Sequence, residues 1–380
     1  MTSEPPPLRA GQALGRYELL LPIAKGGMGQ VWAGRLRGAR GFQKLVAIKT
    51  VLPAREDTER MERMLFEEAR IAGLIQHANV AQTLELGEDR GILYLVMEWV
   101  DGEPLSAVMK SCEGSEIPLL VAVNLIGQAL RGLQAAHELC DEQGVCLGVV
   151  HRDVSPHNLL VSYTGGAKLV DFGIAKAMNQ SSSSTETGEI KGKFAYMAPE
   201  QILVQDVDQR ADLFAVGIIL YLLTTGQHPF KNHDPASVLH SITSQDEVPR
   251  ASLVKPGYSR TLESIVMKAL EKDRQKRWAS AAEMRLALQS AVPDAFAPGI
   301  ENVLEAFMTR TVGGRAAEKR EALRQAELRS ARRRSSSGSL PSVGLSTARC
   351  ADDQVRPAVS VSTVCRYKGS RLHPQTADRG

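Results

Sequence analysis

Cysteine is scarce in this chain, with five cysteines among 380 residues and no two of them spaced as a C-x-x-C pair. An odd number without paired spacing argues against a disulfide framework and against a zinc site, so we expect free thiols in a reducing compartment. The cysteines are Cys112, Cys140, Cys146, Cys350 and Cys365.

Long apolar runs are absent too. The longest uninterrupted one, residues 213–223, falls short of the roughly 20 residues that cross a bilayer and is better explained as a buried core helix. The first residues, Met-Thr-Ser-Glu-Pro-Pro-Pro, have neither the charged nor the apolar region of a signal peptide. We therefore expect a cytoplasmic protein without a membrane span.

The net charge of the whole chain is +3, but its basic residues are unevenly distributed along the sequence. Residues 313–380 contain 14 Lys and Arg against 6 Asp and Glu, a net of +8, which leaves −5 (+3 minus +8) for the rest of the chain. The basic character thus belongs to the C-terminal tail. That tail has no basic patch interleaved with aromatic residues and no recognised nucleic-acid-binding module, so no nucleic acid is expected as a partner.

The spacing of apolar residues predicts an α+β protein with two unequal lobes. Short β-type runs and one stretch of apolar residues at helical spacing predict a small, mostly β lobe with one long helix at the N-terminus. From residue 105 onward, helical spacing predicts a larger, mostly α lobe. Strands are expected at 17–23, 31–36, 45–50, 81–86 and 93–98, and the long helix at 56–75. Helices of the second lobe are expected at 119–138, 210–224, 236–243, 262–270 and 281–290.

The segments outside this core have simpler compositions. Residues 1–15 are rich in Pro and Gly and are expected to lack fixed structure. The extension at 292–334 is expected to contain a short amphipathic segment, 300–308, that packs back on the domain, and a basic helix at 316–334. Residues 335–380 are rich in Ser, Gly, Arg and Pro with few large apolar groups, so we expect a disordered tail.

A glycine-rich segment joins the first two expected strands, and it reads Ala24-Lys25-Gly26-Gly27-Met28-Gly29-Gln30-Val31. Glycines let such a turn close over phosphate groups with its N–H groups pointing inward and no Cβ in the way. Alone, this pattern is more often an ordinary turn. It gains weight because the run Val46-Ala47-Ile48-Lys49 follows about one strand later, which matches the order of the protein-kinase signature.

Lys49 is unusual because it lies on an apolar strand, where burying its charge is costly without a partner. Either it extends to the surface, or it binds the α- and β-phosphates of a nucleotide while a carboxylate on the adjacent helix holds it. The favoured carboxylate is Glu68, nine residues before His77, and Glu67 is the competing choice.

The most specific pattern lies in the second lobe. His151-Arg152-Asp153-Val154-Ser155-Pro156-His157-Asn158 is followed by Asp171-Phe172-Gly173 and then by Ala198-Pro199-Glu200. Each run alone suits an ordinary polar turn, but chance does not explain all three in this order. A substrate hydroxyl needs a carboxylate that accepts and positions it, which is Asp153. The Mg²⁺ ions that neutralise a triphosphate take oxygen ligands, which Asp171 and Asn158 supply.

These motifs resemble those of the bacterial Hanks-type, eukaryotic-like Ser/Thr protein kinases. The two segments His-Arg-Asp-Val-Ser-Pro and Gly-Lys-Phe-Ala-Tyr-Met-Ala-Pro-Glu are similar in sequence to the myxobacterial branch of that family. The resemblance covers residues 16–291. It implies the two-lobed protein-kinase fold, with an N-lobe at 16–97 and a C-lobe at 98–291. It also implies ATP-dependent phosphoryl transfer to Ser and Thr hydroxyls of protein substrates in bacterial signalling, with ATP and Mg²⁺ as cofactors.

The resemblance also assigns the nucleotide site. Met97 is the gatekeeper behind the adenine, and backbone groups of Glu98 and Val100 bond the adenine edge. The full set of implied nucleotide-binding residues is Ala24, Lys25, Gly26, Gly27, Met28, Gly29, Val31, Ala47, Lys49, Glu68, Met97, Glu98, Val100 and Leu160.

Two further positions are implied to be structural. Asp212 anchors the backbone of the catalytic loop from beneath. Arg277 is the buried partner of Glu200.

Three residues depart from the family pattern. Ala24 replaces the first glycine of the loop, which should weaken nucleotide binding. Ser155 replaces a lysine that stabilises the transferring phosphoryl group, and Lys193 replaces a threonine that bonds the catalytic aspartate. Because these two positions meet near Asp153 in the family, we hypothesise that the ammonium group of Lys193 replaces the missing one and is catalytic. A solvated lysine in a mobile loop is the alternative.

Regulation is expected to involve the activation loop. Arg152 directly precedes Asp153, an order that goes in this family with control by phosphorylation of that loop. Thr185 and Thr187 stand at the offset from Gly192 where related bacterial kinases have paired phosphothreonines. We therefore expect autophosphorylation there, with a kinase-domain dimer as the arrangement for transfer in trans.

Two alternatives stay open. The catalytic-loop sequence Ser-Pro-His-Asn favours specificity for Ser and Thr over Tyr. Ser155 and Lys193, which depart from the usual Ser/Thr-kinase pattern, weaken that preference. A catalytically weak pseudokinase, acting as an ATP-binding signalling scaffold, would also explain the departures. Against it, Lys49, Asp153, Asn158 and Asp171 are all present.

Overall fold

The computed structural model describes residues 8–26, 29–51, 63, 66, 69–112, 116–172, 194–230 and 234–337. Several predicted site residues therefore lie outside the described part: Gly27, Met28, Glu67, Glu68, Thr185, Thr187 and Lys193. Most of the helix expected at 56–75 is also outside it, although 69–72 are helical. The chain divides into a compact unit up to Ser336 and a second unit after it.

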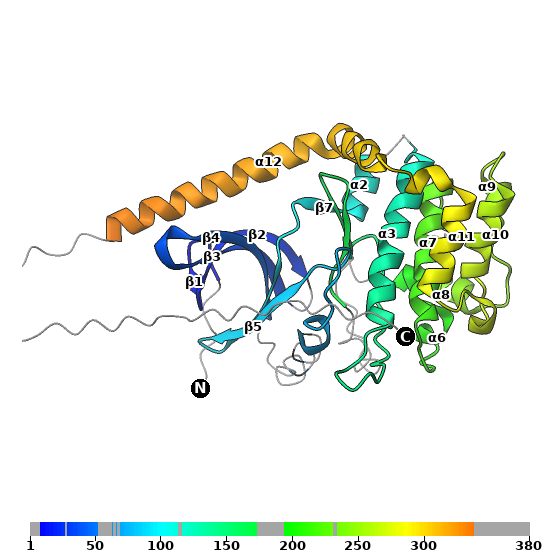
Figure 1. Ribbon diagram of the computed structural model, residues 1–380, viewed down its shortest axis with the longest axis horizontal. Coiled ribbons are helices and arrows are strands. Elements are labelled where there is room, and N and C mark those ends of the chain that lie inside the picture. Colours follow the sequence, from blue (N-terminus) through cyan, green and yellow to red (C-terminus); the bar gives the residue numbers. More distant parts are fainter. Residues whose placement is uncertain are drawn as a thin grey trace, which may run out of the picture. The chain divides into compact units, whose positions relative to one another are not determined.

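The N-terminal lobe is built on a six-stranded antiparallel sheet with the order β1-β2-β3-β4-β6-β5 (Figure 1). The strands are β1 (Ala13–Leu14), β2 (Tyr17–Gly26), β3 (Gly29–Arg37), β4 (Gln43–Val51), β5 (Thr83–Asp89) and β6 (Ile92–Glu98). All five strands expected in this lobe are confirmed to within a few residues. Side chains of β4 alternate between buried and partly exposed, whereas residues 92–96 of β6 are buried on both faces and β5 has no fully buried residue.

Residues 8–15 correct the expectation that the first fifteen residues lack fixed structure. β1 pairs with β2, and Leu14 is 1% exposed within the core of this lobe. Gly15 makes the turn into β2 with a φ of +55°, and a Cβ there would lie 2.3 Å from the hydroxyl of Tyr94. Gly15, part of the composition that predicted disorder, thus serves a tight turn over a packed side chain.

The two faces of β4 differ in burial: one packs in the core of the lobe and the other carries Lys49. Val46 and Ile48 are fully buried in a cluster with Tyr17, Trp32, Tyr94 and Val96. Successive side chains of a strand point to opposite faces, so Ala47 and Lys49 project from the other side. Both are partly exposed. The sheet therefore presents Lys49 on the face opposite its main core.

The C-terminal lobe is mostly helical. Its helices are α2 (Leu105–Ser111), α3 (Leu119–His137), α6 (Pro199–Ile202), α7 (Arg210–Thr225), α8 (Pro235–Thr243), α9 (Ala251–Val254), α10 (Arg260–Ala269) and α11 (Ala281–Ala291). A small sheet of β7 (Gly102–Pro104), β8 (Leu159–Ser162) and β9 (Ala167–Leu169) lies beside them. The five expected helices are present, and the two-lobed α+β fold is confirmed.

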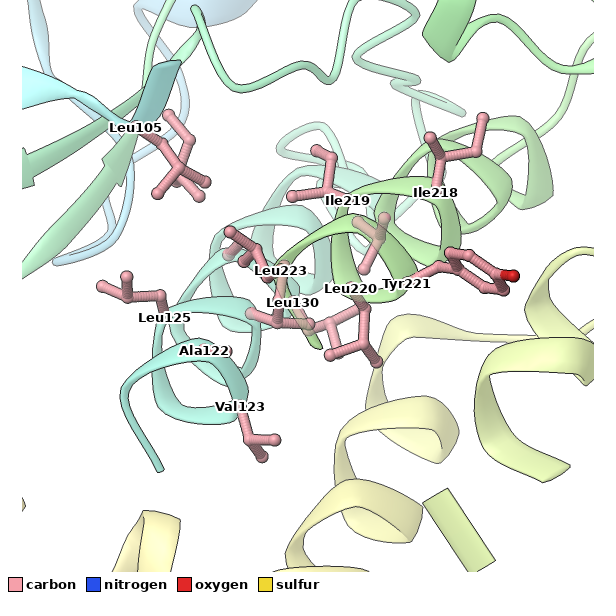
Figure 2. Close-up of a cluster of buried hydrophobic side chains, with 14 of the residues drawn as sticks. Leu105, Ala122, Val123, Leu125, Leu130, Ile218, Ile219, Leu220, Tyr221 and Leu223 are labelled. Atoms are coloured by element: carbon pink, nitrogen blue, oxygen red, sulfur yellow. The ribbon is translucent and has the colours of Figure 1, made fainter. Parts of the chain in front are cut away.

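Helices α3 and α7 form the centre of this lobe, where aliphatic side chains from both interlock (Figure 2). Within the described residues, α3 is long and apolar enough to cross a membrane by length and composition, with a mean hydropathy of 1.3 over its window. It is not an uninterrupted apolar run in the sequence, because polar residues lie within it. As 72% of that window is buried inside the protein, packing in the core accounts for its apolar character.

The C-terminal extension forms one helix, α12 (Ile300–Ser337), where two separate segments were expected (Figure 1). Gly313 and Gly314 do not interrupt it, although each glycine costs a helix about 1 kcal/mol relative to alanine. Burial on both sides of the glycines offsets that cost, because Val312 and Ala316 are 1% and 6% exposed. The buried residues of α12 are Ile300, Leu304, Phe307, Met308, Val312, Ala316, Leu323, Ala326 and Ser330.

Polar contacts attach α12 to both lobes. Its basic side chains meet the segment after β6: Arg315 pairs with Glu103 at 3.1 Å, Lys319 donates to the carbonyl of Gly102 at 2.7 Å, and Arg320 pairs with Asp101 at 2.8 Å. Further along, the buried hydroxyl of Ser330 donates to Glu18 and accepts from Arg35 at 3.1 Å. The helix thus runs from the helical core across the link between the lobes to the N-terminal sheet.

Candidate active site

The catalytic loop is held from beneath by Asp212 in the first turn of α7. Its Oδ2 accepts the N–H of His151 and its Oδ1 accepts the N–H of Arg152, both at 2.8 Å. His137, at the end of α3, reaches the same carboxylate at 2.8 Å through Nε2. Burial alone raises the pKa of Asp212, but its interactions with His137 and His151 together outweigh burial, so the pKa lies below its ordinary value. The anchoring role expected of Asp212 is confirmed.

Asp153 and Asn158 face one another across the loop. The Nδ2 of Asn158 donates to the backbone carbonyl and to the Oδ2 of Asp153, each at 2.8 Å. The two side chains are almost fully buried, with residue exposures of 8% and 4%. Because both bonds use the amide nitrogen, the other end of the amide, Oδ1, is directed away from Asp153.

Lys49 pairs with Asp171 across the two lobes. Its Nζ lies 3.0 Å from the Asp171 Oδ1, and their side chains are 14% and 34% exposed. Asp171 follows β9 with a φ of +55°, a conformation uncommon outside glycine. The neighbouring Val170 donates its N–H to the Asn158 carbonyl at 3.0 Å, which ties this segment to the catalytic loop. The partner predicted for Lys49 was Glu68, which lies outside the described residues.

His151 and Phe172 support these carboxylates from the interior. Their rings lie 4.5 Å apart between centroids, and the His151 Nε2 is 3.2 Å from the carbonyl of Val170. Burial lowers the pKa of His151, which favours a neutral ring. The pair therefore acts as packing beneath the site rather than as a charged group.

The described residues of the predicted nucleotide site lie on the β2–β3 hairpin, on the neighbouring strands β4 and β6, on the segment after β6, and on β8 of the second lobe. Ala24 pairs with Val31 in the β2–β3 hairpin, and Ala47 on β4 pairs with Met97 on β6. Gly29 has a φ of +150°, which requires glycine, whereas Lys25 continues β2 as an extended residue paired with Gln30. On the second lobe, Leu160 occupies β8. The side chains of Val31, Ala47, Met97, Val100 and Leu160 are all partly exposed.

The backbone N–H group of Glu98 already takes part in a hydrogen bond within the protein. The Glu98 N–H donates to the Gln82 carbonyl at 2.8 Å, and its carboxylate pairs with Lys168 at 3.0 Å. Any contact of the Glu98 backbone with a ligand would therefore use its carbonyl oxygen.

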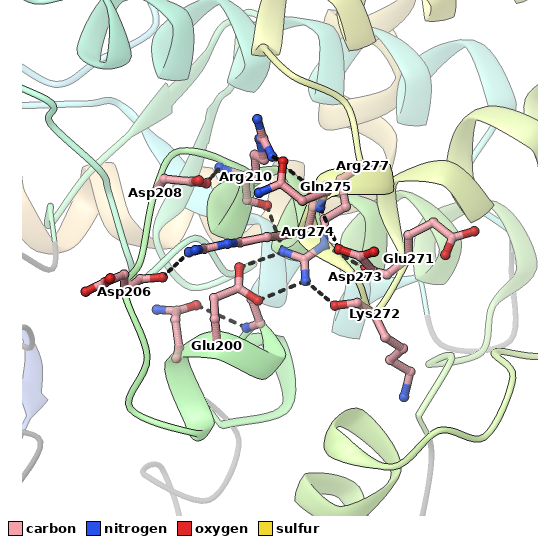
Figure 3. A network of polar contacts seen from close by, with 12 residues as sticks. Glu200, Asp206, Asp208, Arg210, Glu271, Lys272, Asp273, Arg274, Gln275 and Arg277 are labelled. Carbon is pink, nitrogen blue, oxygen red and sulfur yellow. Dashed lines mark hydrogen bonds and ion pairs between the residues drawn. The ribbon is translucent and has the colours of Figure 1, made fainter.

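An ion pair and hydrogen bonds hold the segment Ala198-Pro199-Glu200 against the C-terminal lobe (Figure 3). Glu200 and Arg277 form a two-pronged ion pair, with Nη1–Oε1 and Nη2–Oε2 distances of 2.7 and 2.9 Å. The expected pairing is confirmed. Sequence reasoning missed Gln201 next to it, whose Nε2 donates to the carbonyl of Arg152 at 2.9 Å. Gln201 thus joins this segment to the catalytic loop, and no motif spacing pointed to it or to His137.

Ser155 is the one departing residue of the catalytic loop that the structure describes. It is 1% exposed, and its hydroxyl has no hydrogen-bond partner among the described residues. Lys193, its hypothesised substitute, falls outside them.

The donor set suits Mg²⁺ held together with a nucleotide rather than by the protein alone. Among the described residues there is no group of three or more His, Cys, Asp or Glu side chains that could hold a metal. Mg²⁺ is usually bound through one or two carboxylates plus phosphates and waters. The Asp171 carboxylate and the Asn158 Oδ1 fit that requirement.

Comparison with known proteins agrees with this geometry. The tyrosine-protein kinase MasK of Myxococcus xanthus (strain DK1622) is 38% identical over 281 residues, 73% of this chain and 43% of its own length. The serine/threonine-protein kinase Pkn1 of Myxococcus xanthus is 36% identical over 75% of this chain and 39% of its own length. This chain thus spans about two fifths of these curated relatives.

The crystal structure of the Mycobacterium tuberculosis PknI kinase domain has the same fold. Its TM-score is 0.57 at 25% sequence identity, over 75% of this chain and all of that chain. A family described as the protein kinase domain matches residues 17–289. The chain belongs to the protein kinase family.

Proposed function

We propose that this chain is an active protein kinase that transfers the γ-phosphoryl group of ATP to Ser and Thr hydroxyls of proteins. The observation that carries the proposal is the single connected set of Lys49, Asp171, Asn158 and Asp153. Its members are linked by contacts of 2.8 to 3.0 Å and by the Val170 N–H. A scaffold that only binds ATP would not need the buried Asp153 carboxylate to be held in place.

The residues have separate tasks. Asp153 accepts and orients the substrate hydroxyl, and Asn158 fixes the carboxylate of Asp153 through its Nδ2 group. Lys49 projects from β4 toward Asp171, where its ammonium group would meet phosphate oxygens. Mg²⁺ bound with ATP would be held by Asp171 and the Asn158 Oδ1 and would neutralise charge on the phosphates. Adenine would lie among the partly exposed apolar residues of the strands described above.

Two matched variants test this division. Asp153→Asn should still bind Mg-ATP, measured by calorimetry, but lose phosphotransfer to a peptide substrate by about a hundredfold or more. Asp171→Asn should lose the magnesium-dependent part of ATP binding as well. Wild-type protein that binds Mg-ATP without transferring phosphate would support the scaffold, and an Asp153→Asn variant of undiminished rate would refute the role of Asp153.

Specificity for Ser and Thr is the favoured choice, and Tyr is the second candidate. Pkn1 is named a serine/threonine-protein kinase, whereas MasK is named a tyrosine-protein kinase and is also a close match. Ser155 occupies the position where Ser/Thr kinases usually have a lysine. Phosphoamino-acid analysis after incubation with peptide mixtures separates the two. We expect phosphoserine and phosphothreonine, and phosphotyrosine as the dominant product would overturn the choice.

Lys193 is proposed as the cation that replaces the family lysine at position 155. The support is that Ser155 is buried and offers no positive charge. An electrostatic contact with the transferring group is worth about 2.7–4 kcal/mol of barrier, or about two to three powers of ten in rate. Lys193→Thr alone should therefore lower the rate of phosphoryl transfer by about two to three powers of ten. The double variant Ser155→Lys with Lys193→Thr should restore much of that rate. Full activity of the single variant would refute this role.

Autophosphorylation of Thr185 and Thr187 is proposed as the regulatory step, with a transient dimer of kinase domains for transfer in trans. Phosphosite mapping of active wild-type protein should find phosphate on one or both threonines. Mixing an active chain with an Asp153→Asn chain of different mass should label the inactive one. An unmodified loop in an active preparation would contradict the proposal.

A further inference from the structure

Cys140 and Cys146 are brought together by a short hairpin between α3 and the catalytic loop. The two residues form an isolated antiparallel bridge. On either side of them, Asp141 donates its N–H to the Val145 carbonyl at 2.9 Å, and Leu147 donates to the Leu139 carbonyl at 2.8 Å. The cysteines therefore occupy the pair without mutual backbone hydrogen bonds, where opposite Cα atoms approach to about 4.5 Å. That separation lies within the range of natural disulfides, which begins at about 4.4 Å.

The sulfur atoms already touch. The Sγ atoms of Cys140 and Cys146 lie 3.0 Å apart, and both residues are exposed to solvent. The third cysteine in the described part of the chain, Cys112, is buried. Among these three thiols, an oxidant dissolved in water therefore reaches the pair most readily.

The hairpin is preorganised without a covalent link. The Asp141 Oδ1 accepts the N–H groups of Gln143 and Val145 at 3.0 and 2.8 Å. Gly144 supplies a φ of +80° at the turn, and its N–H donates to the carbonyl of Asp141 at 3.0 Å. Closing a bond between the sulfurs thus needs only a small approach of two side chains and no rearrangement of the backbone.

The position of the hairpin connects it to the active site. Leu139, at its start, packs against a buried cluster that includes Ile75, Val149 and Phe172. Phe172 follows the metal ligand Asp171, and Val149 leads into the catalytic loop. A covalent closure of the hairpin would therefore fix the segment that supports both.

We propose that Cys140 and Cys146 form a reversible intramolecular disulfide, with a low-molecular-weight disulfide such as oxidised glutathione as the oxidant. One of the two cysteine thiols loses its proton to water, and its thiolate attacks one glutathione sulfur, which forms a mixed disulfide and expels one glutathione thiolate. The other cysteine thiol then loses its proton to water and attacks the sulfur of the first cysteine, which expels the second glutathione thiolate. The two cysteines are oxidised by two electrons, and one oxidised glutathione becomes two reduced ones.

The contact between the thiols also affects ionisation. The hydrogen bond to Cys146 is the main cause that raises the pKa of Cys140, so a smaller share of the Cys140 thiol is ionised at a given pH. The step needs no phosphoryl transfer, so it stands or falls independently of the kinase activity.

Peptide mapping of the full-length protein tests the proposal. The reduced chain is equilibrated with graded ratios of oxidised to reduced glutathione, alkylated with N-ethylmaleimide and digested with trypsin. Both cysteines lie in the single tryptic peptide 132–152. We expect this peptide to lose both alkylation sites together and the mass of two hydrogen atoms, and to regain the sites after dithiothreitol. Cys112 should remain alkylatable after unfolding at the same ratios.

Two variants provide the control. Cys140→Ser and Cys146→Ser should each carry one glutathione on the remaining cysteine and should never show the loss of two hydrogens. The proposal is overturned if the wild-type peptide carries separate glutathione groups without an internal bond. It is equally overturned if both thiols stay fully alkylatable at ratios that modify the single variants.

Discussion

Breaking the ion pair between Glu200 and Arg277 should destabilise the C-terminal lobe more than any exposed pair would. The side chains are 4% and 0% exposed, and two parallel hydrogen bonds join them. In Glu200→Ala, the guanidinium group keeps its contacts with the carbonyls of Glu271 and Lys272 but loses its counter-charge. Removing one partner of a buried pair costs about 3–5 kcal/mol, because the other charge stays desolvated.

Urea unfolding followed by circular dichroism measures this cost. With a slope of about 3 kcal/mol per molar urea, the midpoint should fall by about 1 M or more. Glu321→Ala is the matched control, since it removes an exposed partner of Arg324 on α12 and should leave the midpoint nearly unchanged. Equal shifts in the two variants would refute the claim that burial makes the Glu200 pair important.

Three other perturbations give separate tests. Asp212→Asn should lower kcat by about a hundredfold through misplacement of the loop, with little change in KM for ATP, in steady-state kinetics; an unchanged kcat would contradict the anchoring role. Burial lowers the pKa of His228 from 6.5 to about 4. The unfolded chain therefore binds a proton on His228 more tightly than the folded chain does. The free energy of unfolding should fall by up to about 3 kcal/mol as the pH drops from 6.5 to about 4. His228→Gln should flatten that slope in urea unfolding at about pH 7 and about pH 5, and an unchanged slope would exclude His228 as its source. Reversing Arg315 and Arg320 to Glu should raise hydrogen exchange along α12 several-fold, whereas Arg324→Glu, whose partner lies on the same helix, should not.

Sequence patterns predicted elements with a clear apolar pattern, both half-buried ones such as β4 and ones buried on nearly all sides such as α3. The alternation of Val46, Ala47, Ile48 and Lys49 assigned β4 correctly because the core takes every second side chain. The motif residues Asp153 and Asn158 could be found because their chemistry fixes both their type and their spacing. Such features are local, so a single sequence reveals them.

The features that were missed are either too short to show a period or depend on contacts that residue spacing does not encode. β7, β8 and β9 are too short to show a period, and the continuity of α12 follows from burial on both sides of Gly313. The pairing of Lys49 with Asp171 requires the two lobes to face one another, and no spacing encodes it. The contact of Cys140 with Cys146 was hidden because a hairpin, rather than a C-x-x-C motif, creates it.

Autophosphorylation read by mass spectrometry tests the central claim most directly. Purified wild-type chain is incubated with Mg-ATP beside Asp153→Asn, and phosphate is counted on the intact proteins. Because Asp153 is the buried carboxylate that Asn158 holds in place, we predict phosphate on the wild type and none on the variant. Equal incorporation in both, or none in the wild type, would contradict the account.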